Sequence, residues 1–158
     1  MGRFLLILVA AASLRAGDSP LERATLRGVA AVDVVIDPVD PQVAKEGVTK
    51  EKLRAWLEER LRAAGIAVDA SRSEFMALRL TAVRAPRGPF AVALTIALYQ
   101  PVRLPRDPNV RTATATWDVE TVLLADQKLL YQACQDSVDE LAARFVAAYR
   151  SVNSDAAK

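Results

Sequence analysis

Two carboxylates, Asp118 and Glu120, have the residue type and spacing that acid–base chemistry requires. They stand two positions apart in a segment that alternates like a β-strand, so both side chains share a face with Cα atoms about 6.5–7 Å apart. Carboxyl pairs at this range hydrolyse glycosides when a deep cleft holds the sugar and one pKa is raised. Aromatic residues, which would line such a cleft, are only 6% of the chain. We therefore predict no catalytic residue, and a small hydrolase using carboxylates remains a rival hypothesis.

Other reactive groups are scarce. The chain has no histidine and a single cysteine, Cys134, which excludes serine–histidine triads, histidine-bound metals and two-cysteine redox motifs. Cys134 lies in an apolar helical stripe, and we predict an inert buried thiol rather than a reactive one. The alternative is that it pairs with a cysteine of another chain.

No cofactor or metal site is predicted. The glycines at positions 28, 47, 65 and 88 stand alone, so neither a phosphate-binding loop nor a dinucleotide fingerprint can form. Asp37 and Asp40 are the sole candidate oxygen ligands for a metal ion. They lack the glycine turn and the terminal glutamate of a calcium loop, and we interpret them as solvated acids that help a proline-bounded turn.

The N-terminal residues have the layout of a secretory signal peptide. A positive start at Met1–Arg3 precedes nine apolar residues, Phe4–Ala12, and small, turn-prone residues follow to Pro20. The apolar run rises about 14 Å as a helix, too little for a hydrocarbon core of about 30 Å. We predict a signal peptide over residues 1–16, with cleavage between 13 and 20, after Ser13 or Ala16. A retained hydrophobic anchor is the alternative. Lipid attachment is excluded because no cysteine lies near.

The exported chain is electrically balanced. The whole chain carries a formal charge of +2, and removal of residues 1–16 takes away Arg3 and Arg15 and no acid, which leaves zero. Bulk attraction to nucleic acid or to a membrane surface is therefore not expected, and no transmembrane span is predicted after signal removal. We predict an exported protein of the periplasm or the medium, with its oligomeric state left open.

The hydropathy pattern predicts one α+β domain over residues 17–153, followed by a flexible tail at 154–158. Alternating residues indicate a strand, and apolar residues at steps of three and four indicate a helix. The expected order is β-α-β-β-β-β-α. Both helices pack on one face of a mostly antiparallel sheet, and the other face stays open, as a two-layer sandwich. The first strand and helix form a crossover unit, and the later strands are all expected to be antiparallel. The predicted ranges are 26–37, 49–65, 66–68, 75–85, 90–104, 111–122 and 127–152, with a turn at Pro105–Asn109.

Two surfaces are candidates for binding. Seven arginines lie between Arg72 and Arg111, where the net charge is +5, whereas residues 112–143 carry −5. Three arginines, Arg103, Arg106 and Arg111, surround one turn, and Arg84 and Arg87 surround another at the opposite end of the sheet. A guanidinium suits phosphate or carboxylate groups of a partner protein or an amphiphile. The alternative is that these arginines only keep a neutral protein soluble.

The second candidate surface is the open sheet face. The expected strand pattern places Thr95, Tyr99 and Thr114 on it, among alanines and further threonines. Such a flat face of small residues suits cover by another chain or an acyl-type ligand. An ordinary solvent-exposed face is the alternative.

Several segments resemble a group of small, uncharacterised exported bacterial proteins. They are LRGVAAVDVVI from Leu26, GVTKEKLRAWLEERLRAAGIAV from Gly47, the Thr116–Trp117 pair and FVAAYRSVN from Phe145. At fold level the element order is similar to LptE-like and TolB N-terminal-like envelope modules. The chain departs from the first by lacking an acylated cysteine and from the second by lacking a propeller.

The function expected from the sequence is therefore binding. We predict a non-enzymatic accessory protein of the bacterial cell envelope that binds another protein or an amphiphile. A self-assembling structural subunit is the second rival to this prediction, beside the hydrolase.

Overall fold

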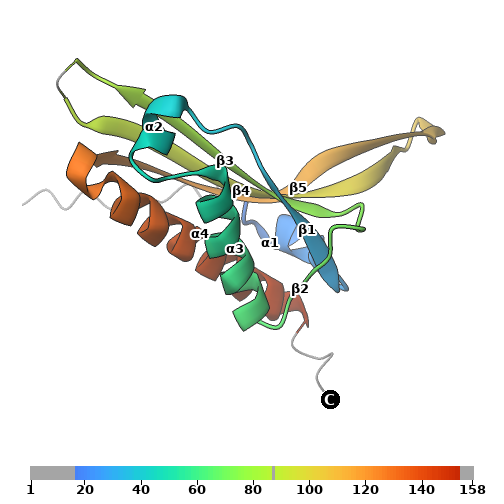
Figure 1. Ribbon diagram of the computed structural model, residues 1–158. Coiled ribbons are helices and arrows are strands. Elements are labelled where there is room, and N and C mark those ends of the chain that lie inside the picture. The colour runs from blue at the N-terminus through green and yellow to red at the C-terminus, as the bar shows by residue number, and fades with distance from the viewer. Residues whose placement is uncertain (1–16, 87, 154–158) are drawn as a thin grey trace, which may run out of the picture.

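The computed structural model describes residues 17–86 and 88–153, and in it helices cover one face of a five-stranded sheet (Figure 1). The predicted signal peptide, Arg87 and the predicted tail at 154–158 lie outside the described residues. Within the described ranges, no helix combines the length and apolar character that a membrane crossing would need. The elements are α1 (Pro20–Ala24), β1 (Ala31–Ile36), α2 (Pro41–Lys45), α3 (Lys50–Ala63), β2 (Ala67–Val68), β3 (Phe75–Arg84), β4 (Phe90–Leu104), β5 (Asp107–Ala125), the 3-10 turn η1 (Gln127–Leu129) and α4 (Leu130–Asn153).

The sheet is mixed and open, with strand order β2-β1-β3-β4-β5. β1 pairs in parallel with both of its neighbours, whereas β3, β4 and β5 form an antiparallel meander. The predicted α+β class and sequence of main elements are confirmed. The predicted crossover unit is confirmed, because β2 follows α3 and runs parallel to β1. The prediction that the later strands are all antiparallel is wrong for β3, which pairs in parallel with β1 and forms no hairpin with β2. Residues 69–74 carry the chain from one side of β1 to the other, so both strands run parallel to it.

Local chemistry fixes the two long helices. The Thr49 hydroxyl accepts a hydrogen bond from the Lys52 amide at 3.3 Å and begins α3. Gly65, at φ +81°, follows its end in the left-handed region that favours glycine. The C-terminal helix α4 is held at its far end, where the Tyr149 hydroxyl donates to the Val29 carbonyl at 2.9 Å.

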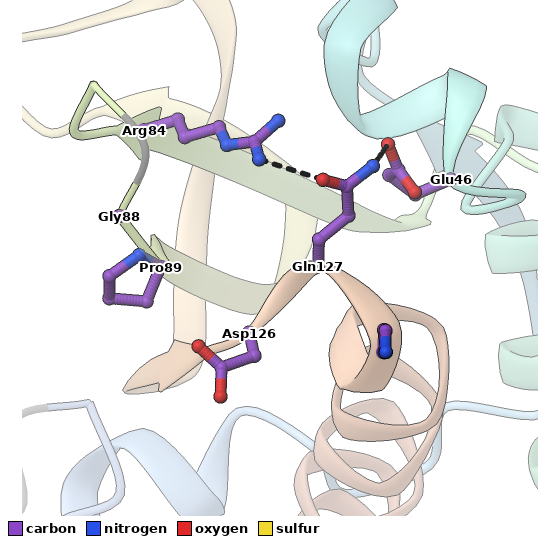
Figure 2. Close-up of a pocket in the computed structure, with 7 residues that line it drawn as sticks. Glu46, Arg84, Gly88, Pro89, Asp126 and Gln127 are labelled. Atoms are coloured by element: carbon purple, nitrogen blue, oxygen red, sulfur yellow. Dashed lines mark hydrogen bonds between the residues drawn. The ribbon is translucent and has the colours of Figure 1, made fainter.

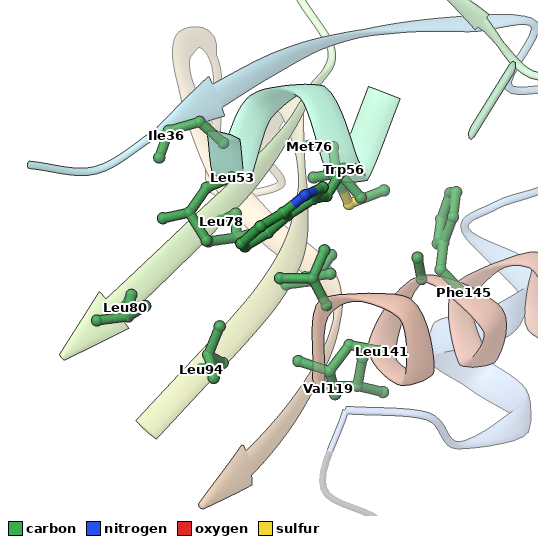
Figure 3. Packing of buried hydrophobic residues seen from close by; sticks show 14 of the residues in the cluster. Ile36, Leu53, Trp56, Met76, Leu78, Leu80, Leu94, Val119, Leu141 and Phe145 are labelled. Atoms are coloured by element: carbon green, nitrogen blue, oxygen red, sulfur yellow. The ribbon is translucent and has the colours of Figure 1, made fainter. Parts of the chain in front are cut away.

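The core lies between the sheet and the two helices. Figure 3 shows Trp56 of α3 and Phe145 of α4 within one cluster of buried side chains, which also contains Leu94 and Val119 of the sheet. The predicted apolar face of β4 is buried along its length, and the stripes of both helices close over it. The predicted two-layer packing is confirmed. The inward residues of β4 are Phe90, Val92, Leu94, Ile96 and Leu98.

The structure also differs from the prediction before α3. The short helix α1 was not predicted, and two further segments have another conformation than expected. Residues 26–30 are not part of the first strand. They form a turn in which Gly28 has φ +76°, while Leu26 enters the core. The expected polar loop before Gly47 contains α2, whose N-cap Asp40 accepts a hydrogen bond from the Gln42 amide at 2.7 Å. In both places a local cap or turn decides the conformation, and strand alternation does not.

Truncating a side chain to alanine should destabilise the protein much more on the helix-covered face of the sheet than on the outer face. We expect Phe145→Ala to lower the free energy of unfolding by about 3–5 kcal/mol, because it empties a fully buried site against Trp117. The matched control is Leu124→Ala on the outer face, where the side chain is 74% exposed and a change within about 0.5 kcal/mol is expected. Urea unfolding measures both. Equal losses would contradict the assignment of the helix-covered face as the core.

Candidate interaction surface

The outermost two strands extend beyond the helices as a two-stranded arm. The arm comprises residues 100–116 of β4 and β5, and Figure 1 shows it projecting from the body of the molecule. All of residues 107–115 are exposed. The 19 residues of β5 span about 63 Å as a strand. The 24 residues of α4 span only about 36 Å. The strand β5 is therefore longer than the helix α4 that packs against it, and the part of β5 that extends beyond α4 belongs to the arm.

Trp117 anchors the arm where it leaves the body. It is the first buried residue of β5 after the exposed stretch, and its ring meets Phe145 of α4 at 5.1 Å between centroids. Its indole Nε1 donates to Asp18 Oδ1 at 3.0 Å. Asp18 also accepts two hydrogen bonds from the Arg23 guanidinium, each 2.7 Å. This pairing and the indole hydrogen bond hold the pKa of the Asp18 carboxyl below its ordinary value, against the opposing effect of burial.

A second set of contacts, which includes residues of β4, holds the arm where it leaves the body. The Thr116 hydroxyl donates to Gln100 Oε1 at 2.6 Å, and the Gln100 amide donates to Glu74 Oε1 at 3.3 Å. Next to them the rings of Tyr99 and Phe75 stack in parallel with centroids 5.0 Å apart. The arm therefore starts from a base in which side-chain contacts join β3, β4 and β5.

A β-bulge at Thr116 changes the faces of the arm. Leu98 pairs with Trp117 but Tyr99 pairs with Ala115, so Thr116 is an extra residue in β5. Directly paired residues share a face, and Thr114, which pairs with Gln100, therefore lies opposite to Tyr99. The prediction that Thr95, Tyr99 and Thr114 line one face is wrong for Thr114. Thr95 and Tyr99 do share the outer face.

The arm brings the three predicted arginines together. Arg103 and Arg111 are directly paired across the strands, and Arg106 occupies the turn. All three are exposed, and within the described residues no ion pair involves them. The predicted turn at Pro105–Asn109 is shorter than expected, because β5 already begins at Asp107. Like charges directly opposite one another destabilise a sheet, so the free arm gains nothing from this placement.

The outer face is apolar at the end remote from the arm. This outer patch consists of Val83, Ala91, Ala93, Val122 and Leu124, which pair with one another across β3, β4 and β5. Val83, Val122 and Leu124 are 69%, 72% and 74% exposed. The open face was expected to be a flat face of small residues around Thr95 and Tyr99. Its exposed apolar part lies nearer the β3–β4 turn.

The two carboxylates of the hydrolase hypothesis lie on this outer face as well. Asp118 is half-buried and pairs with Ala97, and Glu120 is exposed and pairs with Thr95. Burial, and then the nearby charges of Glu22 and Glu120, raise the pKa of the Asp118 carboxyl. The small side chain of Ala97 beside Asp118 provides no polar group for orienting a sugar.

A polar pocket of about 640 Å³ opens at the β3–β4 end of the body (Figure 2). Gln127 spans it, accepting from Arg84 Nη2 and donating to Glu46 Oε1, both at 2.7 Å. Two cationic and two carboxylate side chains line the described part of the pocket, so their formal charges cancel. Sequence reasoning missed this pocket, because its residues come from four separate segments: Glu46, Arg84, Gly88, Pro89, Asp126, Gln127 and Lys128.

The remaining predicted groups have local partners. Asp37 pairs with Arg79 at 2.7 Å, and Asp40 caps α2, so the two acids serve separate structural roles. Cys134 is fully buried in the stripe of α4, as predicted.

The comparisons with known proteins give fold-level likenesses only. No protein-family model matches the chain, and no curated protein matches it. Among solved structures it is similar to the dodecamer of a PelC variant from Paraburkholderia phytofirmans, with 11% identity, a TM-score of 0.45 and 73% of this chain and 85% of that one covered. It is also similar to a candidate lipoprotein from Caulobacter crescentus, with 16% identity, a TM-score of 0.27 and coverages of 87% and 92%. At such low values neither likeness informs the function. The likeness to LptE-like and TolB N-terminal-like modules stays a prediction.

The anchor of the arm should depend on pH. The folded-state pKa of Asp18 is lowered, so its contribution to stability is present above about pH 4 and is lost as pH falls through the folded-state value. We expect Asp18→Asn to lower the free energy of unfolding by about 1–3 kcal/mol at pH 7. The difference should shrink at pH 3. Denaturant titrations at both pH values measure it, with the exposed Asp126→Asn as control. An equal deficit at pH 3 and pH 7 would contradict the assigned ionic role.

The buried thiol should resist modification. Burial raises the pKa of Cys134 to about 11, so the reactive thiolate is scarce at neutral pH. We expect labelling by a thiol-specific disulfide reagent at pH 8 to require unfolding of the chain. Absorbance stopped-flow with and without urea measures this, and complete labelling of the folded protein within seconds would show that the thiol is accessible.

Proposed function

We propose that this protein is an exported, non-enzymatic binding protein of the bacterial cell envelope that holds an acidic partner protein with its arm. The predicted signal peptide supports export. The observation that carries the binding proposal is the arm itself, a long ribbon with three exposed arginines.

Isolated two-stranded ribbons are marginally stable in water because they have no core of their own. The β5 half of the arm is exposed on both faces from residue 107 to 115, and the arm carries a repulsive arginine pair. It is nevertheless built on a base of buried and stacked aromatic rings. A bound partner would supply both the missing packing surface and the missing counter-charges. Binding therefore explains features that cost the free protein stability.

The chemistry of the arm favours a protein over a lipid surface. Insertion into a bilayer interface needs several large apolar side chains. Within residues 100–116, all of which the structure describes, Val110 is the only exposed large hydrophobic side chain, at 43%. The arm instead offers guanidinium groups, threonine hydroxyls and the edge of β5, which is the outermost strand of the sheet. Carboxylates and an added strand are the partner features that such a surface recognises.

Charge reversal on the arm tests the proposal. We expect Arg103→Glu with Arg106→Glu to reduce partner capture at least about tenfold, because both attraction and carboxylate hydrogen bonding are lost. A photo-crosslinking residue at Ala113 reports capture in the exported protein within intact envelopes. The matched control is Arg27→Glu with Arg150→Glu, which makes the same charge change at exposed sites away from the arm.

The outcomes distinguish the rival hypotheses. Undiminished crosslinking by the arm variant would contradict the proposal. Co-sedimentation of the purified protein with anionic phospholipid vesicles, lost in the arm variant, would replace the protein partner by a lipid. Light scattering that shows arm-dependent oligomers would identify the partner as a second copy. A hydrolytic activity abolished by Glu120→Gln would overturn the non-enzymatic function.

A further inference from the structure

The Asp118 carboxylate lies in acidic surroundings. It is half-buried on the outer face of β5, and Glu22 and Glu120 are the charged groups that act on it most strongly. Among the described residues, no lysine or arginine forms an ion pair with it. A partly desolvated negative charge beside other acids is unfavourable unless a positive group lies close.

Gly17 lies directly against this carboxylate. The Asp118 amide donates to the Gly17 carbonyl at 3.2 Å, which ties the start of the described chain to the edge of β5. A Cβ atom at Gly17 would stand 2.7 Å from Asp118 Oδ1 and would also overlap the Asp118 carbonyl. Because Gly17 has φ +84° as well, glycine is required here on two grounds. Its amino nitrogen shares the Cα with that Cβ position and therefore lies within about 5 Å of Oδ1.

The sequence places an expected cleavage position at this residue. The bond between Ala16 and Gly17 is one of the two predicted ends of the signal peptide. Hydrolysis of that bond, with water as co-reactant, leaves a carboxylate on Ala16 and an α-ammonium on Gly17. We propose that export processing cuts between Ala16 and Gly17 and that the new α-ammonium of Gly17 forms an ion pair with the Asp118 carboxylate.

This ion pair would give the folded protein a contact that exists only after the signal peptide has been removed. Before the cut, the nitrogen of Gly17 is a neutral amide, and Asp118 has no cationic partner among the described residues. After the cut, an opposite charge at this range lowers the pKa of Asp118 and raises that of the amine. Cleavage after Ser13 would instead leave three further residues, which could hold the ammonium up to about 10 Å away. The inference rests on export alone and does not depend on the partner proposed for the arm.

The N-terminus of the exported protein gives the first test. The full chain is expressed with its own residues 1–16 in a bacterial host that exports it, and the mature protein is analysed by intact mass and N-terminal sequencing. We expect a chain that starts at Gly17. A chain that starts at Leu14, or one that retains Met1, would overturn the proposal.

The titration of the α-amine gives the second test. Carbon-13 dimethylation of the mature N-terminus reports its pKa by NMR. We expect a value about one unit above the ordinary 7.7–8.0 of such amines. We expect a return to the ordinary range in Asp118→Asn and little change in the control Glu140→Gln, which removes one acid at an exposed position of α4. An ordinary value in the unmodified sequence would overturn the ion pair even if cleavage occurs at Gly17.

A stability cycle covers the case in which the amine label disturbs the fold. One extra alanine before Gly17, left by a different processing protease, moves the ammonium away from Asp118. We expect this extension to lower the melting temperature by about 2–4 °C with Asp118 present. In the Asp118→Asn variant the same extension should lower the melting temperature by less than about 1 °C. The displaced ammonium has no carboxylate at position 118 to lose in that variant. Equal shifts in the Asp118 chain and in the Asp118→Asn variant would contradict the pairing.

Discussion

The packing of Trp117 between β5 and α4 is the contact on which the rest of the arrangement depends. On one side of this residue β5 belongs to the core, and on the other side every position from Ala115 back to Asp107 is exposed. The indole meets Phe145 through its ring and Asp18 through its nitrogen. Apolar burial and a satisfied polar group therefore act at one point, which is how a large aromatic side chain is buried at low cost. The position of Trp117 sets where the body ends and the arm begins.

Sequence periodicity was sufficient to predict the strands and helices of the body, because these elements have regular alternating faces, apolar stripes and caps. The bounds of β4 were predicted to the residue, since its buried face alternates without interruption from Phe90 to Leu98. The stripe and cap of α3 were equally clear, because Thr49 and Gly65 mark its two ends. The parallel placement of β3 beside β1 could not be predicted. A six-residue connection is compatible with a hairpin by length alone, and only the three-dimensional path shows that it crosses β1.

The candidate surface was predictable in its residues but not in its geometry. Arg103, Arg106 and Arg111 were found because charge clusters around a turn are visible in a sequence. The bulge at Thr116 has no such signal, as threonine suits a regular strand equally well, and it moves Thr114 to the other face. The arm itself had an unused signal in the predicted strand at 90–104, which spans about 50 Å, whereas the longer predicted helix at 127–152 spans about 39 Å. The role of Asp18 joins residues 99 positions apart, and no local pattern reveals such a contact.

The N-terminal segment also has a consequence for the sheet edge. Three successive features occupy the outer backbone groups of β5 within the body: Gly17 accepts from the Asp118 amide, and Thr25 and Arg144 donate to the Thr116 and Glu120 carbonyls. An unprotected edge strand recruits foreign strands and leads to aggregation. Here the middle of that edge is closed by the chain's own residues. A strand that pairs with β5 at these positions must first displace those contacts, whereas the edge of β5 along the arm is exposed from residue 107 to 115. The same contacts therefore protect the body against fibrillar growth and leave the arm as the open stretch of this edge.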